Sequence, residues 1–180
     1  MKENHDFSTL EIGVVGLGLM GTSILVSLLV SGHKVTGIAP LPEDMDGAID
    51  RIKSQLEHAG EAGLLREPLN HYLQRLHLSK NYKDLKHCSL VQECVTEIIS
   101  IKTEVYKKIN QHTSPTTVIA TNTSAIPISE LQKNVKYPSQ FIGIHWAEPA
   151  YMTRFLEVTK GDLTDEKTAE WVLSLSYSWR

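Results

Sequence analysis

Polar side chains follow several of the predicted strands, and their types suit proton transfer from a hydroxyl group. His145 ends a strand predicted at 141–145, Ser124 follows one predicted at 116–121, and Glu157 lies within the last strand. A histidine can take a hydroxyl proton near neutral pH, and a carboxylate on its far ring nitrogen fixes the tautomer and stabilises the charged ring. Because a hairpin would bring Glu157 back toward His145, we expect these two to form the reacting pair, with Ser124 holding the reacting oxygen.

Each of these residues also has a structural interpretation. A histidine at a strand end can be purely structural, and the Asn122-Thr123-Ser124 segment is typical of turns and caps. Glu97 and Lys102 can form a solvated pair where a helix begins. The residues alone leave the catalytic and the structural interpretations open.

The remaining histidines do not share a strand end with polar companions. We expect them on helices or loops in contact with solvent, and their spacing to Cys88 and Cys94 does not resemble a metal site. They are His5, His33, His58, His71, His77, His87 and His112. No metal ion is therefore predicted.

A segment near the N-terminus is suited to holding a phosphate. Gly16, Gly18 and Gly21 have G-x-G-x-x-G spacing between two apolar runs. A strand that turns through glycines into a helix leaves backbone N–H groups free at the positive end of the helix dipole. The glycines allow a tight turn, close approach of a pyrophosphate, and tight helix–strand packing. Since a second strand is predicted at 34–38, the segment from Gly16 to Gly21, including Leu17, Leu19 and Met20, is expected to bind a dinucleotide.

The same uncharged stretch, 12–32, is long enough to suggest a membrane span or a signal peptide. A signal peptide needs a basic leader, yet Lys2 is outnumbered by Glu3, Asp6 and Glu11. A membrane span does not account for the glycine-broken IGVV strand or for the strand pattern that follows. A buried βαβ unit accounts for both, and it is the interpretation that we adopt.

The elements that must position these residues alternate between strands and helices. Strands are expected at 12–15, 34–38, 76–79, 89–95, 116–121, 141–145 and 154–160. After the helix that follows the glycines, further helices are expected at 44–60, 68–75, 98–111, 129–132 and 165–178, with a single turn at 82–86. This alternation predicts an α/β fold with a Rossmann-like, doubly wound and mostly parallel sheet. The link at 146–153 is too short for a helical crossover, so the last strand is expected to be antiparallel.

Composition limits the classes of protein to consider. The chain has 180 residues, of which 41% are hydrophobic and 22% charged, as in one soluble globular domain. A net charge of −3 gives no reason to expect nucleic acid or a membrane surface as a partner. The two cysteines form no C-x-x-C pair, so a reducing cytoplasm is the expected location.

Four segments together carry a resemblance to a known family. They are VVGLGLMGTSI, SLVQECVTEIISIKTEVYKKI, ATNTSAIPISEL and FIGIHWAEPAYMTRFLEVTKG. The chain resembles the N-terminal NAD-binding domain of the 3-hydroxyacyl-CoA dehydrogenase family, and the match covers nearly all of residues 1–180. The resemblance implies a Rossmann domain that uses NAD to oxidise an L-3-hydroxyacyl-CoA, or a related 3-hydroxy acid, reversibly.

The resemblance also assigns roles to individual residues. It implies that His145, after the FxGxH strand, is the catalytic base, and that Glu157, twelve residues later, pairs with it. It implies that Ser124 touches both substrate and nicotinamide. Glu97 and Lys102, on either side of the start of a helix, are implied to contact NAD.

The chain departs from the family pattern at the cofactor end. The family ends its second strand in an aspartate that binds the adenosine ribose, whereas this chain has Ala39; Glu43 or Asp44 is the alternative from a displaced loop. No arginine or lysine stands beside them in the sequence, so NAD is expected rather than NADP. The asparagine of the family's HFFNP or HPFNP segment is replaced by Glu148.

The chain also departs on the substrate side and in length. Family members carry CoA-binding lysines on the second helix, whose end here contains Glu57, His58 and Glu61. They also continue into a helical domain that forms a homodimer and closes the site, and we expect that domain to be absent from this chain. Two alternatives therefore stay open. The chain is a catalytically incomplete NAD-binding module, or it belongs to a dehydrogenase of small hydroxy acids that does not use CoA.

Overall fold

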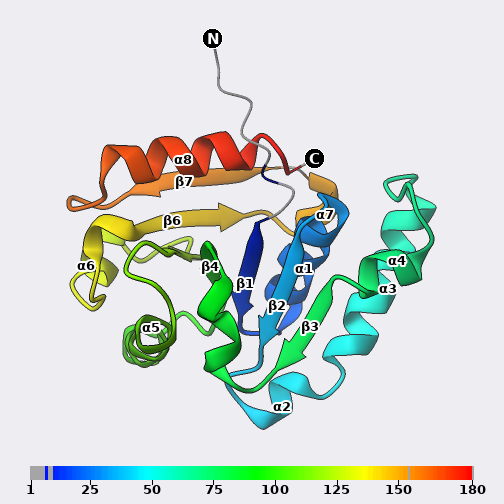
Figure 1. The fold of residues 1–180 in the computed structure, drawn as a ribbon, viewed down its shortest axis with the longest axis horizontal. Coiled ribbons are helices and arrows are strands. Elements are labelled where there is room, and N and C mark those ends of the chain that lie inside the picture. Colours follow the sequence, from blue (N-terminus) through cyan, green and yellow to red (C-terminus); the bar gives the residue numbers. More distant parts are fainter. Residues whose placement is uncertain (1–6, 8–9, 154, 180) are drawn as a thin grey trace.

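Over the residues that the structure describes, which are Phe7, 10–153 and 155–179, this computed structural model folds around a seven-stranded sheet (Figure 1). The strand order is β3-β2-β1-β4-β5-β6-β7. The strands are β1 (Glu11–Val15), β2 (Lys34–Ile38), β3 (Leu76–Ser79), β4 (Leu90–Glu93), β5 (Val118–Thr121), β6 (Phe141–Trp146) and β7 (Leu156–Lys160).

Helices connect and cover these strands. They are α1 (Leu19–Val30), α2 (Pro42–Met45), α3 (Ala48–Glu61), α4 (Leu69–Leu73), α5 (Ile99–His112), α6 (Ile128–Gln132), α7 (Ala150–Thr153) and α8 (Glu166–Ser176), with 3₁₀ turns η1 (Tyr82–His87) and η2 (Pro138–Gln140). The chain runs outward from β1 to β3 and then returns to begin the other half at β4. The switch between β1 and β4 is the point where ligands of doubly wound sheets bind, beyond the carboxyl ends of the strands.

All strand pairs are parallel except β6 and β7, as the sequence predicted. The chain turns back through α7, and in the antiparallel register His145 lies directly opposite Glu157. Side chains opposite one another in a sheet lie on the same face, so the hairpin brings the two predicted partners together.

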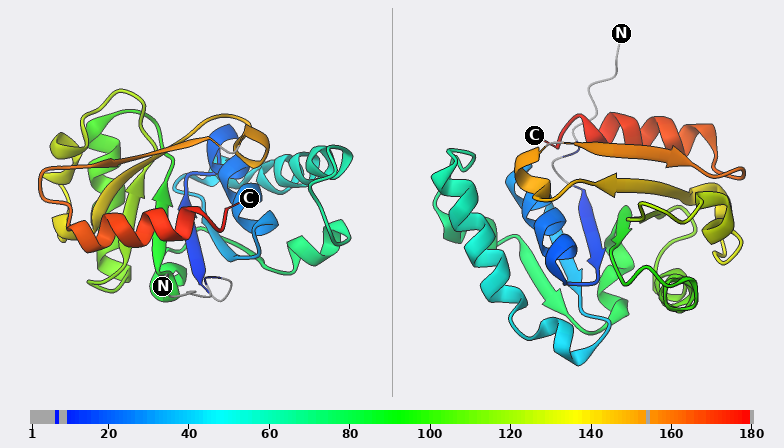
Figure 2. Two further views of the ribbon diagram at one scale, coloured as in Figure 1. Left: turned by 90° about the horizontal axis from the view of Figure 1, so that it is seen from above. Right: turned by 180° about the vertical axis from the view of Figure 1, so that it is seen from behind.

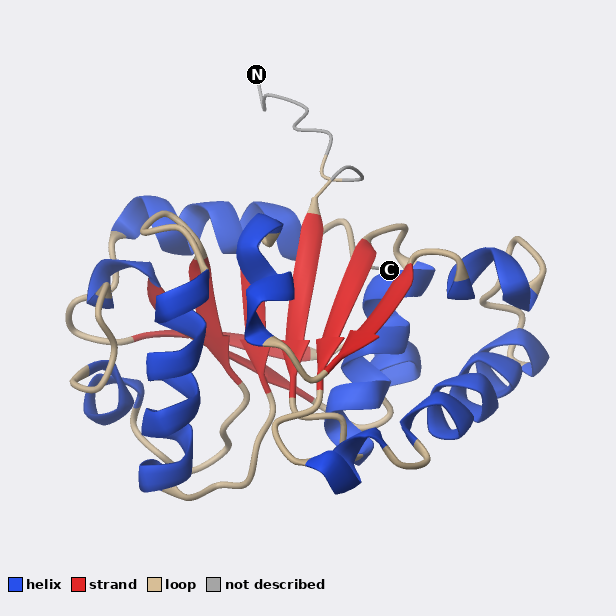
Figure 3. Cartoon of the chain, turned by 60° about the horizontal axis from the view of Figure 1, so that its bottom comes forward, coloured by secondary structure: helices blue, strands red, loops and turns tan. Residues whose placement is uncertain are grey.

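Helices cover both faces of the sheet (Figure 3). One core includes Ile24 of α1, Ile52 of α3 and Val172 of α8, while the other includes Tyr106 of α5 and Leu131 of α6. Helix α8 packs along β7 at the edge of the sheet (Figure 2). Burial on both faces explains why β1, β5 and β6 are largely apolar, whereas the edge strands β3 and β7 are only partly buried.

The uncharged stretch around α1 is apolar because it is buried. Every residue from Gly21 to Leu29 is buried, and α1 packs against β1, β2, α3 and α7. Among the described residues, no helix combines the length and the hydropathy that a membrane crossing requires. The βαβ interpretation of this stretch is therefore confirmed.

Two local differences from the predicted elements concern loops near the site. The helix expected at 44–60 is two helices, α2 and α3, because Gly47 between them has a φ of +70°, which a helix cannot continue through. The short helix α7 within the last hairpin was not predicted. His5, one of the histidines expected on helices or loops, and Arg154, at the start of the last predicted strand, lie outside the described residues.

Candidate active site

Two of the three glycines after β1 have a steric reason to be glycine, and the third borders open space. Gly16 has a φ of +97°, and a Cβ there would lie 2.8 Å from the backbone oxygen of Cys94. A Cβ on Gly21 would lie 1.8 Å from the backbone oxygen of Gly16, so no larger residue fits where α1 meets β1. A Cβ on Gly18 would meet nothing within 4 Å, and this open space lies beside the N-terminus of α1. The turn therefore fits a dinucleotide pyrophosphate, as its spacing predicted.

The other residues of the turn have apolar side chains, which differ in their exposure. Leu17 is fully buried in the core, Met20 is half-buried, and Leu19 is exposed. Any contact of Leu17 with a cofactor would therefore be made by its backbone. Its carbonyl oxygen already accepts a hydrogen bond from Nη2 of Arg51 in α3 at 2.8 Å.

A cavity of about 490 Å³ opens beside this turn, beyond the carboxyl ends of β1, β2 and β4. Its walls come from the glycine turn, the loop after β2, the segment after β4, and α5. The lining residues are Gly16, Gly18, Pro40, Leu41, Asp44, Cys94, Val95, Thr96, Ser100, Ile101, Glu104, Val105 and Lys108. The position and size suit the adenosine half of a dinucleotide.

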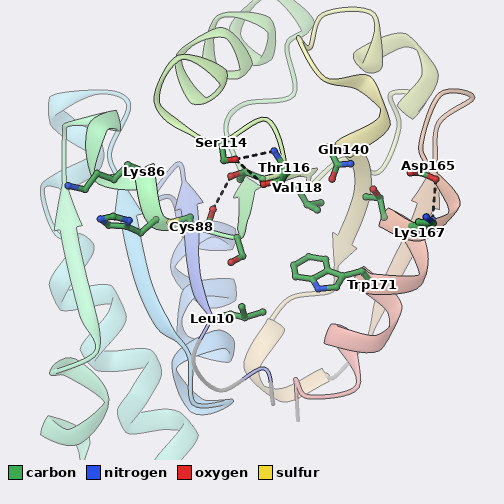
Figure 4. Close-up of a pocket in the computed structure, with 14 residues that line it drawn as sticks. Leu10, Lys86, Cys88, Ser114, Thr116, Val118, Gln140, Asp165, Lys167 and Trp171 are labelled. Carbon is green, nitrogen blue, oxygen red and sulfur yellow. Dashed lines mark hydrogen bonds between the residues drawn. The ribbon is translucent and has the colours of Figure 1, made fainter. Parts of the chain in front are cut away.

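A larger cavity of about 690 Å³ lies at the amino ends of the strands (Figure 4). Ser114 and Thr116 hydrogen bond to each other on one side of it, and the indole of Trp171 forms another wall. Neither the glycine turn nor His145 contributes to it. Volume alone therefore does not identify the active site of this fold.

A buried cluster of polar groups joins the ends of β4 and β5. Both oxygens of Glu93 contact Nζ of Lys102 in α5, at 2.9 and 3.0 Å, and both side chains are fully buried. Thr121 and Tyr106 also donate to Glu93 Oε2, at 2.7 and 3.0 Å, and the Val95 N–H donates to Oε1 at 2.6 Å. Such complete pairing is what allows an ion pair to be buried.

Within this cluster, Lys102 also contacts Glu97, a residue expected to bind the cofactor. Its ammonium also lies 3.1 Å from Oε2 of Glu97, whose side chain is 38% exposed. The interpretation of Lys102 as half of a solvated pair is wrong, because its side chain is enclosed by protein. Of the two residues expected to touch NAD, Glu97 is the one that solvent reaches.

The loop after β5 is shaped by the same groups. Thr123 Oγ1 donates a short hydrogen bond to Glu97, and it accepts one from the Ile126 N–H at 3.0 Å. Asn122 Oδ1 accepts from the Trp146 N–H at 3.0 Å, which ties this loop to the residue after His145. Ser124 is exposed at the tip of the loop, and among the hydrogen bonds of the described residues none joins it to His145.

The pair His145 and Glu157 is formed as the hairpin register requires. Nδ1 of His145 lies 3.0 Å from Oε2 of Glu157, and the two side chains are 31% and 58% exposed. With Nδ1 directed at the carboxylate, Nε2 is the ring nitrogen that can accept a proton from a ligand. The arrangement can therefore perform general base chemistry at the carboxyl edge of the sheet.

The thiol nearest the glycine turn is not a reactive group. Burial, and after it the negative charge of Glu93, raises the pKa of Cys94 well above its ordinary value. The thiol remains protonated at neutral pH, so Cys94 serves the cavity wall as a small apolar side chain.

Two departures from the family pattern are visible around the site. Ala39 is 2% exposed and belongs to the core, so it presents no polar group to the cavity. Glu148 is exposed after β6, next to α7, where burial and then the charge of Glu148 raise the pKa of Tyr151. The Tyr151 hydroxyl lies 3.1 Å from Nδ1 of His58, which ties α7 to the end of α3.

One of the other histidines contradicts the expectation of solvent contact. His33 is 1% exposed, and its Nε2 accepts a hydrogen bond from Nε1 of Trp179 at 3.1 Å.

The residues that the sequence argument missed are Glu93, Tyr106 and Thr121. The available signal was the charge of Glu93 at the end of an otherwise buried strand, which requires a buried partner.

Comparison with known proteins identifies the family to which this chain belongs. The family model for the NAD-binding domain of 3-hydroxyacyl-CoA dehydrogenase matches residues 11–179. This chain belongs to that family. It is therefore an NAD-binding domain, and its Rossmann-like fold is that of its relatives.

Individual relatives support the same assignment. A 3-hydroxybutyryl-CoA dehydrogenase of Clostridioides difficile is 30% identical over 174 residues, which are 94% of this chain and 60% of the relative. An L-carnitine dehydrogenase of Staphylococcus epidermidis is 31% identical over 163 residues, 88% of this chain and 49% of that protein. The crystal structure of (S)-3-hydroxybutyryl-CoA dehydrogenase from Ralstonia eutropha superposes with a TM-score of 0.89 at 28% identity, covering 95% of this chain and 61% of that one. The chain thus spans about 60% of the length of these two 3-hydroxybutyryl-CoA dehydrogenases.

Proposed function

We propose that this domain belongs to an NAD-dependent dehydrogenase that reversibly oxidises an L-3-hydroxyacyl-CoA, or a related 3-hydroxy acid, to the 3-keto compound. The observation that carries the proposal is the contact of 3.0 Å between His145 and Glu157 at the same edge of the sheet as the glycine turn. NAD, when bound, supplies the acceptor for the hydride. The remaining chemistry, which is removal of the hydroxyl proton, falls to this chain.

In this proposal each side chain has one task. His145 takes the substrate hydroxyl proton on Nε2, and Glu157 keeps the ring oriented and stabilises its positive charge. Ser124 holds the reacting oxygen from the neighbouring loop. The backbone of the glycine turn holds the pyrophosphate, and Glu97 contacts the cofactor while Lys102 holds Glu97 in place.

The experiment replaces His145 with alanine in the full-length protein. Turnover of (S)-3-hydroxybutyryl-CoA should fall about 10²- to 10⁴-fold, the usual contribution of a general base, while NADH affinity stays unchanged. His71→Ala, an exposed histidine of α4, is the matched control and should retain activity. Wild-type turnover in the His145 variant would exclude the assigned base.

A dehydrogenase of small hydroxy acids is the second candidate, favoured by acidic Glu57, Glu61 and Glu148 where CoA phosphates would need cations. Comparing kcat/KM for (S)-3-hydroxybutyryl-CoA and for L-carnitine separates the two. NADH binding with no turnover of either would indicate an NAD-binding module.

We also propose a homodimer formed by a C-terminal helical domain. A cytoplasmic location is proposed as well, which the free thiols Cys88 and Cys94 support.

A further inference from the structure

The loop after β2 gives the dinucleotide cavity an unusual wall. In the family, a carboxylate at the end of this strand serves the adenosine ribose, but here the position holds the buried Ala39. The cavity wall is formed instead by Pro40 and Leu41 and then by Asp44 in α2. Glu43, the other acidic residue of α2, is exposed outside the cavity lining. The structure therefore separates the two carboxylates that the sequence could not distinguish.

The carboxylate of Asp44 has one oxygen available for a ligand. Its Oδ2 accepts a hydrogen bond from the Leu41 N–H at 3.2 Å, whereas Oδ1 makes none within the described part of the chain. Oδ1 is thus the oxygen of this cavity-lining carboxylate that a ribose hydroxyl can approach.

Arg51 of α3 fixes the distance between this carboxylate and the phosphate-binding turn. Its Nη2 donates to the Leu17 carbonyl at 2.8 Å and to the Asp44 carbonyl at 3.4 Å, and Nη1 reaches the Asp46 carbonyl at 3.5 Å. Gly47 allows the close approach, since a Cβ there would lie 3.2 Å from Nη1. One guanidinium therefore holds α2 against the glycine turn.

We propose that Asp44, positioned by Arg51, accepts the hydroxyls of the adenosine ribose and makes this chain select NAD over NADP. The inference rests on the proposed function, since it requires a dinucleotide in this cavity. A carboxylate accepts hydrogen bonds from ribose hydroxyls and repels a 2′-phosphate. Among the cavity-lining residues, Lys108 on the α5 wall carries the cationic side chain that a preference for NADPH would require.

Calorimetric titration of the 180-residue chain with NADH and NADPH tests the proposal without relying on activity. The wild type should bind NADH at least about tenfold more tightly than NADPH. Asp44→Asn should weaken NADH binding about tenfold and narrow the difference between the affinities for NADH and NADPH. The amide still accepts from the Leu41 N–H but has lost the negative charge. Glu43→Gln is the matched control, and it should titrate like the wild type.

A further variant tests the positioning role of Arg51. Arg51→Met should lower the preference for NADH over NADPH while retaining a cooperative thermal melt. The inference would be overturned if Asp44→Asn and Glu43→Gln bound NADH with equal affinity, or if the wild type preferred NADPH. In either case the domain would still be a dinucleotide-binding domain. A wild type that binds neither nucleotide would overturn both the inference and the proposed function.

Discussion

At the scale of single residues, the catalytic pair combines a short contact with substantial exposure to solvent. Glu157 is 58% exposed, so water screens its attraction for the charge that develops on His145. Its main contribution is then orientation, because a ring held through Nδ1 presents Nε2 at a constant angle. Catalysis should consequently depend more on the hydrogen bond than on the negative charge.

Replacing Glu157 tests this distinction. Glu157→Gln keeps an acceptor for Nδ1 and should lower kcat about tenfold, whereas Glu157→Ala should lower it about a hundredfold. KM should change little in both variants, since neither is expected to remove a substrate contact. Steady-state kinetics of the full-length protein measure both values, with Asp162→Asn, an exposed carboxylate in the turn after β7, as control. Equal losses in the two Glu157 variants would mean that charge, rather than orientation, is what the carboxylate supplies.

At the scale of elements, the cluster around Glu93 holds β4, β5 and α5 in register. Lys102→Met should destabilise the domain by about 3–5 kcal/mol, because it leaves the Glu93 carboxylate buried without its counter-ion. The double variant Glu93→Gln/Lys102→Met should recover much of this loss, since the remaining amide is neutral. Urea denaturation gives the free energy of unfolding for each.

Lys107 provides the matched control for Lys102. It lies on the same helix and pairs with Glu104 at 2.7 Å, but both side chains are more than half exposed. Lys107→Met should therefore cost no more than about 1 kcal/mol. A double variant at Glu93 and Lys102 that is as unstable as Lys102→Met alone would contradict the argument from uncompensated charge.

The same elements show how far sequence reasoning reaches. The order of strands and helices was predictable because short segments rich in apolar and β-branched residues alternate with segments of helical apolar period. The His145–Glu157 pair was predictable because a short hairpin has few possible registers. The break before α3 was not predictable from the apolar positions, because it lies in the backbone, which is extended at Asp46 and has a positive φ at Gly47. Nor could the sequence choose Asp44 over Glu43, because that choice depends on Arg51 docking on Leu17.

At the scale of the whole molecule, the buried His33 joins the turn after α1 to the C-terminal end of the described chain. The Trp179 indole donates to His33, after α1, and its ring lies 5.0 Å from that of Trp146 at the end of β6. Burial, and secondarily the charge of Arg75, lowers the pKa of His33 from its ordinary value of 6.5, although the nearby backbone of Leu10 and Phe7 opposes the shift. The link between His33 and Trp179 was hidden from the sequence, since the residues are 146 positions apart.

This histidine should make stability depend on pH in a definite direction. A group whose pKa is lowered by folding binds protons more readily in the unfolded chain, so its contribution is complete above about pH 6.5 and is lost as the pH falls through the lowered value. The free energy of unfolding should therefore decrease between pH 7.5 and 5.5, as measured by urea denaturation across that range. His33→Gln, whose amide can still accept from Trp179, should flatten this decrease, while the exposed His87→Gln should retain it. A His33→Gln slope equal to that of the wild type would assign the pH dependence to other groups.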